Sequence, residues 1–381
     1  MHALGIRKIC ALLPCLSTEV GHIYHYHIAV QHSVESLGWI YEAFIPKGAK
    51  IFPLPAHWHP VLANDHWDVP KTFFFCLRML FGNISPLRSI FRKANHETIV
   101  FLEHFTLQSL AAIWISLWFL KPSFQFWILH RYAYSKNHFK TWIYRLFHWF
   151  LERKIEKGRF RILTDSELLA VLQVDCFSRS VDVVPIPHTV NLERIEKKGP
   201  CLLWWPGGSM REDKGLLSIQ KLANSLLQRK DFLLVLAEKG KSLFPSSDSL
   251  MFIPTVLSSE DYTNWMRTAD LVLLPYSPQD YAHRTSGIFV ESICLGSIPV
   301  VSKKTWMAYE LGKYDLSELT LDLEQFSSPN HLAMLLSDIK ILEKLTVMRS
   351  YYRQFHSENG FAAVFKQLTL QTPSNTTLCG A

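Results

Sequence analysis

The sequence has none of the cysteine patterns that mark a disulfide-stabilised or zinc-binding protein. Its seven cysteines are an odd number, are scattered along 381 residues, and include no Cys-x-x-Cys pair. Disulfide frameworks and structural zinc sites need paired or closely spaced cysteines. The pattern favours a reducing compartment, and we expect a cytoplasmic protein.

Long apolar segments and glycine-rich nucleotide motifs are also missing. The longest uncharged run, residues 105–120, spans 16 residues and contains Gln108 and Ser109. A bilayer-spanning helix needs about 20 apolar residues, so we expect a buried helix here. Residues 1–15 lack the apolar length of a signal peptide and predict a first buried strand. Neither Gly-x-Gly-x-x-Gly nor Gly-x-x-x-x-Gly-Lys-Ser/Thr occurs, which disfavours a nicotinamide-dependent oxidoreductase.

A metal site is not predicted either, although 13 of the 17 histidines precede residue 150. On the first expected helix His25 and His32 share a face, whereas His22 and His27 point elsewhere. No carboxylate or cysteine joins them at ligand spacing.

Length and charge suggest two domains with different partners. A chain of 381 residues exceeds what one core usually organises, and 48% apolar residues argue against disorder. Residues 1–160 hold 18 Lys and Arg against nine Asp and Glu, whereas the remainder is nearly balanced. The basic half suggests an anionic partner, which could be lipid headgroups, a phosphorylated acceptor or nucleic acid.

Short apolar runs alternate with helical patterns, which predicts parallel sheets covered by helices on both faces. Strands are expected at residues 9–13, 98–103, 126–130, 160–164 and 181–186, and again at 201–205, 232–237, 250–253, 271–275 and 298–302.

A proline-marked, charged linker at residues 184–200 separates the two halves. We therefore expect the α/β class, with two doubly wound Rossmann-like domains that face each other across a cleft. The expected parts are residues 1–187, residues 200–345, and a closing helix with a tail at residues 346–381.

Residues 206–215, Pro-Gly-Gly-Ser-Met-Arg-Glu-Asp-Lys-Gly, join an expected strand to an expected helix. Glycines let the backbone approach a ligand, and a helix N-terminus offers unpaired N–H groups. Arg211 and Lys214 add positive charge. The stretch predicts a diphosphate site; the alternative is a surface turn with solvated charges.

Residues 274–291 run from the end of an expected strand through a polar loop into a helix. Ser286 can cap that helix while its first N–H groups face an anion. Glu291, four residues after Gly287, can accept two hydrogen bonds from a ribose diol. The alternative is an ordinary glutamate on a helix surface.

In this order, the two stretches resemble the C-terminal domain of retaining GT-B glycosyltransferases of the family 4 kind, over about residues 200–312. The matching residues are Arg211, Lys214-Gly215, Pro275, Glu291 and Gly296-Ser-Ile-Pro-Val-Val. The first glutamate of the family's Glu-x7-Glu element falls at His283. Residues 284–291, Arg-Thr-Ser-Gly-x-x-x-Glu, are similar to a branch that acts on surface polysaccharides. The N-terminal half resembles the family only in layout.

The resemblance implies roles for particular residues. The donor would be bound by Gly208, Arg211, Lys214, Tyr276, Arg284, Ser286, Gly287 and Glu291, with Arg211 and Lys214 on the diphosphate and Glu291 on the ribose. In the first domain it implies a loop at Gly21 and His22 against the donor phosphates and the acceptor, and a catalytic histidine facing the cleft at His130. His104 is a lesser candidate, and a packed histidine is the alternative for both.

Residues 139–158 mix aromatic and basic side chains at helical spacing. Trp142, Leu146, Trp149 and Phe150 fall on one side. The helix could lie on an anionic membrane, but we expect it to use that side for packing in its domain.

Together these patterns predict a glycosyltransferase that moves a sugar from a nucleoside-diphosphate sugar to an acceptor hydroxyl, in cell-surface glycan or lipid-linked polysaccharide synthesis. The resemblance implies retained configuration, without metal ion or cofactor, and no Asp-x-Asp motif occurs. A peripheral contact with the inner face of an anionic membrane stays open, whereas dispersed Lys and Arg disfavour nucleic acid. The alternatives are a catalytically inactive GT-B-like protein that binds sugar or nucleotide, which His283 would favour, and less so the oxidoreductase.

Overall fold

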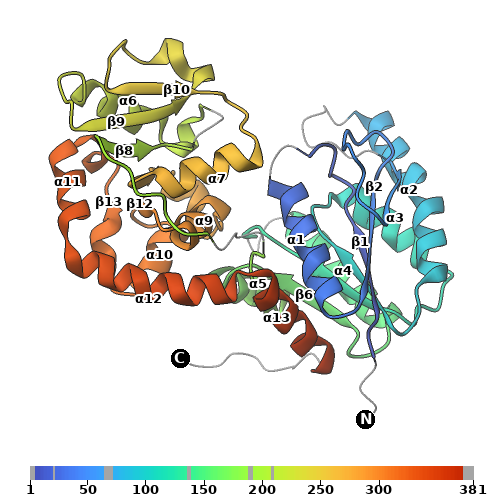
Figure 1. The fold of residues 1–381 in the computed structure, drawn as a ribbon. Helices are drawn as coiled ribbons and strands as arrows, with labels where there is room; N and C mark the ends of the chain where they lie inside the picture. The colour runs from blue at the N-terminus through green and yellow to red at the C-terminus, as the bar shows by residue number, and fades with distance from the viewer. Residues whose placement is uncertain are drawn as a thin grey trace. The chain divides into compact units, whose positions relative to one another are not determined.

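The computed structural model describes residues 5–19, 22–63, 72–134, 139–187, 192–206 and 210–371. It divides the chain into unit 1, which comprises Met1–His188 and Glu358–Ala381, and unit 2, which comprises Thr189–Ser357 (Figure 1). Each unit has its own all-parallel sheet with helices packed on it, so the predicted class with two doubly wound domains is confirmed. The expected third part, residues 346–381, does not stay together, because the chain passes from unit 2 to unit 1 at residue 358.

The sheet of unit 1 has the strand order β3-β2-β1-β4-β5-β6-β7. Its strands are β1 Lys8–Leu12, β2 Ile40–Pro46, β3 Trp58–Leu62, β4 Thr98–Leu102, β5 Gln125–Leu129, β6 Phe160–Thr164 and β7 Asp182–Val183. β1 lies between β2 and β4, and its Cys10 pairs in register with Glu42 of β2 and with Val100 of β4. Every residue of β4, β5 and β6 is buried, as expected for parallel strands covered on both faces.

The helices of unit 1 form two layers. They are α1 His22–Ser36, α2 Phe73–Lys93, α3 Leu107–Leu117, α4 Phe139–Lys154, α5 Glu167–Phe177 and α13 Glu358–Leu370. Side chains alternate between the faces of a strand. Val100, Leu102 and Phe126 join the core formed with α2, α3, α4 and α5. Phe101 and Trp127 point to the opposite face, where α1 and α13 lie side by side (Figure 1).

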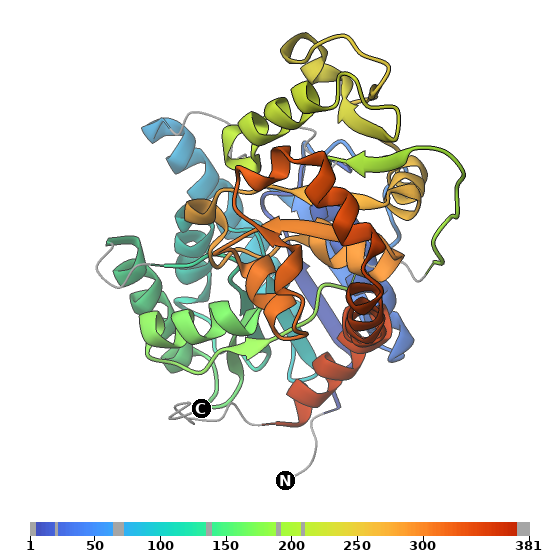
Figure 2. The ribbon, with the colours of Figure 1, turned by 90° about the vertical axis from the view of Figure 1, so that its left-hand side faces the viewer.

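The last helix, α13, is held to unit 1 by aromatic contacts. The Phe365 ring lies 4.9 Å from the ring of Trp127 and 5.6 Å from that of Phe101. Phe361 stacks on Phe365 at 4.4 Å and meets Tyr26 of α1 edge-on at 6.3 Å. Figure 2 shows α13, in red, following directly on α12. The C-terminal segment therefore completes a face of the first sheet.

The sheet of unit 2 has the order β10-β9-β8-β11-β12-β13. Its strands are β8 Cys201–Trp204, β9 Phe232–Ala237, β10 Leu250–Ile253, β11 Leu271–Leu274, β12 Ile298–Ser302 and β13 Thr320–Leu321. Its α-helices are α6 Leu216–Ser225, α7 Ser259–Thr268, α8 Pro278–Tyr281, α9 Gly287–Leu295, α10 Trp306–Gly312, α11 Pro329–Ser337 and α12 Ile339–Phe355. Short 3₁₀ turns are η1 Glu212–Lys214, η2 Glu238–Leu243, η3 Ser317–Leu319 and η4 Gln325–Ser327.

Both sheets wind outward in two directions from a central strand pair, β1 and β4 in unit 1 and β8 and β11 in unit 2. At such a point the segments that follow the two neighbouring strands cross to opposite faces of the sheet. Doubly wound sheets bind ligands there, beyond the carboxyl ends of the strands.

Two expectations about helices have different outcomes. Residues 105–120 contain the buried helix α3, and no helix among the described residues is long and apolar enough to cross a membrane. For α4 the expected packing side is wrong. Its buried residues are Thr141, Tyr144, Phe147, His148 and Leu151, whereas Trp142 and Trp149 are exposed.

The packing of α13 yields a stability prediction. Phe365→Ala should lower the free energy of unfolding by about 3–5 kcal/mol, because it empties a fully buried site against Phe101 and Trp127. Leu370→Ala, on the same helix but exposed, is the matched control and should change it by less than about 0.5 kcal/mol. Urea unfolding of both variants measures the difference. Equal, small losses would mean that α13 is not part of the core of unit 1.

Candidate functional site

In unit 2 the two motif-bearing stretches lie against each other at the carboxyl ends of β8 and β11. Gly215 ends the turn η1 with a φ of 83°, and a Cβ at this position would come within 2.1 Å of the Pro275 carbonyl oxygen. Only glycine therefore allows this approach. The N–H of Ser277 donates to the carbonyl oxygen of Asp213 at 2.8 Å, which joins the two stretches directly.

Three basic side chains gather at this junction, and we call Arg211, Lys214 and Arg284 the cation cluster. Arg211 pairs with Asp213 at 2.8 Å and is half exposed. Burial, followed by the charges of Arg211 and Arg284, lowers the pKa of the Lys214 ammonium, while Asp213 opposes this in part. The positive charges are therefore close enough to repel one another, and an anion would relieve that repulsion.

Two stacked tyrosines lie beside the cation cluster. The rings of Tyr276 and Tyr281 are 4.5 Å apart, with Lys214 Nζ 5.7 Å from the first ring and Arg284 Cζ 5.2 Å from the second. Tyr276 is only 2% exposed, yet its hydroxyl has no hydrogen-bond partner among the described residues. An unsatisfied buried hydroxyl costs about 1–3 kcal/mol, so a bound ligand would be a stabilising partner.

The helix α9 begins next to this loop. Ser286 is its N-cap and accepts a hydrogen bond from the N–H of Phe289 at 3.3 Å, and Gly287 is the first helical residue. The N-terminus of a helix attracts anions through its unpaired N–H groups. The sequence-predicted residues Arg211, Lys214, Tyr276, Arg284, Ser286 and Gly287 thus come together in this part of unit 2.

Glu291 lies on the second turn of α9 and is partly buried. Its Oε2 accepts a 2.6 Å hydrogen bond from the hydroxyl of Tyr262 on α7, and the Tyr262 ring packs edge-on against Trp204. Burial, followed by the charge of Glu291, raises the pKa of Tyr262 well above its ordinary value, so the hydroxyl stays a donor. This contact orients the carboxylate from behind.

Three of the predicted site residues cannot be placed. Gly21 and Gly208 lie outside the described residues, and for His22 only the backbone is described, as the first residue of α1.

The structure places His130 in the interior of unit 1. The ring is 1% exposed, with Nδ1 2.9 Å from the Tyr134 hydroxyl and Nε2 3.2 Å from Nε2 of His148. Phe105 and Phe177 pack against its faces. Burial lowers its pKa to about 3, so the ring is neutral at physiological pH. The expected cleft-facing histidine is corrected to a buried core histidine.

Sequence reasoning missed a buried charge cluster in unit 1, formed by Glu103, Arg131, His27 and Asp165. Glu103 Oε1 lies 2.8 Å from Arg131 Nε, and its Oε2 lies 3.0 Å from His27 Nε2. Arg131 also reaches Asp165 at 3.2 Å, and His27 Nδ1 is 2.9 Å from the Tyr41 hydroxyl. Burial alone would raise the pKa of Glu103, but Arg131 and His27 outweigh it and hold the pKa well below its ordinary value.

A signal for this cluster is present in the sequence. Glu103, Arg131 and Asp165 follow the three neighbouring strands β4, β5 and β6 by one or two residues, so the parallel sheet brings them to the same edge. His104, the lesser candidate, also turns toward this cluster, with its Nε2 3.2 Å from Glu103 Oε1. Polar residues that follow neighbouring parallel strands are therefore expected to lie close together.

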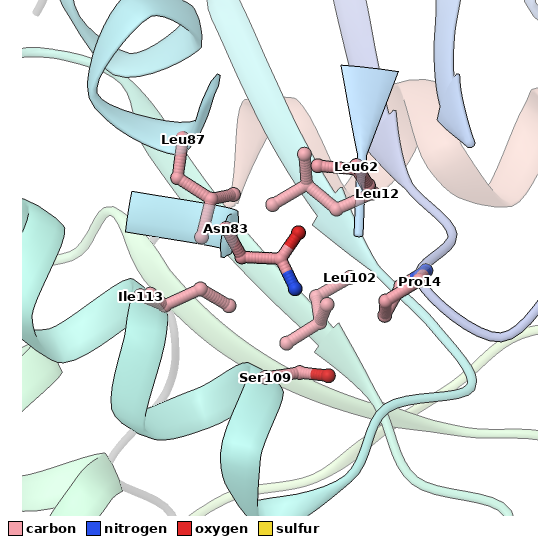
Figure 3. Close-up of a pocket in the computed structure, with 8 residues that line it drawn as sticks. All are labelled: Leu12, Pro14, Leu62, Asn83, Leu87, Leu102, Ser109 and Ile113. Atoms are coloured by element: carbon pink, nitrogen blue, oxygen red, sulfur yellow. The ribbon is translucent and has the colours of Figure 1, made fainter. Parts of the chain in front are cut away.

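A small apolar pocket lies at the crossover point of unit 1. The side chains around it belong to β1, β3, β4, α2 and α3, and Figure 3 shows Leu12, Pro14, Leu62, Asn83, Leu87, Leu102, Ser109 and Ile113. Its volume is about 10 Å³, near the space of a single water molecule and far below the roughly 300–1,000 Å³ of ligand pockets. Among the described residues, no group of three or more His, Cys, Asp or Glu side chains has the arrangement of a metal site.

No model of a protein family matches the sequence, and no curated protein matches it. Several solved structures match this structure in fold. A sucrose-phosphate synthase from Thermosynechococcus elongatus has a TM-score of 0.67 at 13% identity, over 95% of this chain and 98% of its own. A glycosyltransferase from Rickettsia africae ESF-5 has a TM-score of 0.64 at 11% identity, over 96% and 98%. The Anabaena protein HepE in complex with UDP has a TM-score of 0.65 at 10% identity, over 95% and 99%.

These identities show the fold alone. The chain has the GT-B fold, with two parallel-sheet α/β domains, that these glycosyltransferase structures share.

The charge cluster of unit 1 leads to the second prediction. Glu103→Gln should lower the free energy of unfolding by about 3 kcal/mol at pH 7, because removing one member of a buried ion pair leaves Arg131 incompletely neutralised. The matched control is Glu97→Gln, whose pair with Arg7 is long at 3.8 Å and exposed, and should cost less than about 1 kcal/mol.

The same variant gives a pH test. The pKa of Glu103 is lower in the folded state than in the unfolded state, so its stabilisation is present above about pH 4.3 and is lost as the pH falls through the folded pKa. Urea unfolding at pH 7 and near pH 3 should show that Glu103→Gln loses less unfolding free energy on acidification than the wild type does. Identical acid losses would contradict an ionised Glu103.

Proposed function

We propose that this chain is a glycosyltransferase that moves a sugar from a nucleoside-diphosphate sugar to an acceptor hydroxyl. Unit 2 would bind the donor and unit 1 would bring the acceptor, a glycan or lipid-linked molecule in surface polysaccharide synthesis. The proposal includes retained configuration and no requirement for a metal ion or cofactor. Peripheral contact with an anionic membrane also belongs to it.

The observation that carries this proposal is the cation cluster at the β8–β11 crossover. The charges of Arg211 and Arg284 are close enough to lower the pKa of the Lys214 ammonium, and Arg211 pairs with Asp213. The N-terminus of α9 adds its partial positive charge beside them. A diphosphate has the charge and the oxygen acceptors to satisfy this arrangement.

The same groups suit the chemistry of transfer. As the bond between the anomeric carbon and the diphosphate oxygen breaks, the diphosphate leaves with the bonding electrons and gains negative charge. Fixed positive groups near that oxygen stabilise the transition state more than the ground state, which is the condition for catalysis. The proposal assigns this role to the side chains of Arg211, Lys214 and Arg284.

Two further observations support the choice of ligand. Glu291, oriented by Tyr262, lies on α9, the helix that begins beside the cation cluster. It is four residues after Gly287, the first residue of that helix, and this spacing suits a ribose next to a diphosphate. The HepE structure of the same fold contains UDP. His283, in place of a family carboxylate, implies that the sugar itself is contacted differently.

The test is binding followed by turnover. UDP, GDP, ADP and CMP are compared by thermal shift, where a nucleotide at 100 times its Kd adds about 2.7 kcal/mol of stability. Arg211→Ala and Lys214→Ala should each weaken the preferred nucleoside diphosphate about tenfold or more, because each removes a charge-assisted contact. Calorimetry measures the affinities. Unchanged affinity in both variants would remove the cation cluster from the site.

Lys340→Ala, an exposed lysine on α12, is the matched control and should leave the affinity unchanged. Lys214→Ala should also leave the free energy of unfolding of the ligand-free protein unchanged or slightly higher, because its surroundings already disfavour its charge. Hydrolysis or transfer from the corresponding nucleotide sugar then separates an enzyme from an inactive binding protein.

Glu291 gives the most specific prediction. Glu291→Gln should weaken the nucleoside diphosphate by roughly tenfold to a hundredfold, since a charged acceptor for the ribose hydroxyls becomes neutral. A 2′,3′-dideoxy nucleotide should lose a similar amount with the wild type, and the two changes together should cost little more than either alone. Additive losses in this cycle would show that Glu291 and the ribose do not touch.

Tyr262→Phe is the control for the comparison of Glu291→Gln with the 2′,3′-dideoxy nucleotide. It removes the hydroxyl that holds Glu291 but no group expected to contact the ligand. Its effect should therefore be smaller, and should fall on the normal nucleotide more than on the dideoxy form, because Glu291 would be less well oriented toward the ribose.

A further inference from the structure

The outward side of α2, α3 and α4 in unit 1 exposes aromatic side chains in unusual number. The exposed fractions reach 81% for Phe74, 84% for Phe119 just after α3, and 57% for Trp142. Among the described residues, all three exposed tryptophans and five of the six exposed phenylalanines lie here: Phe73, Phe74, Phe81, Trp118, Phe119, Phe139, Trp142 and Trp149. We call this surface the aromatic face. Isolated exposed apolar residues are ordinary, but a concentration of this kind marks a binding surface.

The three helices make this surface continuous. α2 and α3 run side by side and in the same direction, because Gln108 near the start of α3 reaches Cys76 near the start of α2, and Ser116 reaches Ile84 further along. At the far end Trp118 stacks on Phe150 of α4 at 6.4 Å. α3 itself carries no charged residue, and its outward positions, such as Trp114 and Ile115, are only partly covered.

Positive charge surrounds the aromatic face. α2, α3 and α4 together contain eight Lys and Arg and a single acidic residue, Glu152. Both carboxylate oxygens of Glu152 accept hydrogen bonds from Arg179, from Nε at 2.7 Å and from Nη2 at 2.9 Å, so Glu152 offsets little of the surrounding charge. Arg153 lies over the Trp149 ring at 4.2 Å, and Lys121 is exposed between α3 and β5. The basic half noted in the sequence is therefore concentrated here.

We propose that the aromatic face binds the surface of a membrane rich in anionic lipids. Tryptophan and phenylalanine settle at the boundary between headgroups and acyl chains, and Lys and Arg beside them pair with anionic headgroups. A protein interface would also use aromatic side chains and Arg, but eight Lys and Arg against one paired acid favour an extended anionic surface. This inference rests on the membrane contact included in the proposed function and names the surface that makes it; nucleotide binding in unit 2 is a separate part, so either can fail alone.

The test uses the full-length protein and vesicles of phosphatidylcholine with or without one third phosphatidylglycerol. The wild type should float with the anionic vesicles, bind neutral vesicles much less, and be released by high salt. Phe119→Ser with Trp142→Ser should weaken binding about tenfold or more by removing apolar anchors. Lys121→Gln with Arg153→Gln should weaken it roughly tenfold on anionic vesicles only.

Met334→Ser, which changes an equally exposed apolar residue on α11 of unit 2, is the matched control and should bind like the wild type. Urea unfolding should show that all variants stay folded, since every changed side chain is exposed. Failure of the wild type to bind anionic vesicles would overturn the proposal. So would wild-type binding by both double variants, or a dimer in sedimentation that the aromatic variant splits without any vesicle binding.

Discussion

All strands within each sheet are parallel, and this constraint determines where chemistry can occur. Each strand delivers the residues that follow it to the same edge, so side chains far apart in the sequence meet there. Unit 2 uses this edge to gather Arg211, Lys214 and Arg284, of which Arg211 pairs with Asp213. Unit 1 gathers Glu103, Arg131 and Asp165, in which two carboxylates contact one guanidinium. The first arrangement is rich in positive charge and the second is not, which is why we propose that unit 2 binds the donor.

The fold could be predicted where burial is uniform, and not where it is mixed. Strands such as β4 and β6 are buried along their whole length, because helices cover both faces. β2 alternates between buried and partly buried or exposed residues and includes Glu42, which pairs with Lys8 at 2.7 Å. β3 is an edge strand containing Pro60, and a proline argues against a strand unless it lies at an edge. Such segments gain their structure from neighbours that the local sequence does not reveal.

The residues of the candidate site also differ in whether the sequence alone could predict them. A glycine with positive φ and a serine at a helix start are local features, so Gly215 and Ser286 could be predicted from their surroundings. His130 could not be judged from its position after a strand alone. Strand alternation puts it on the same side as Phe126 and Ile128, both in the core, and that comparison would have indicated burial. The charge cluster around Glu103 requires the strand order, which no single motif contains.

The two sides of α4 show why composition alone was insufficient. Tyr144, Phe147 and Leu151 form one apolar stripe, and Trp142 with Trp149 lies on another. Both stripes have helical spacing, so the sequence could not determine which of them faces the sheet. Once the first is buried, the second remains on the surface of a helix group that contains eight basic residues and one paired acid. The excess positive charge of the first half therefore lies apart from the cation cluster that we propose for the nucleotide in unit 2. Salt should consequently weaken lipid binding through exposed charges more than the proposed nucleotide binding, because Lys214 and Arg284 of unit 2 are partly buried and screened less.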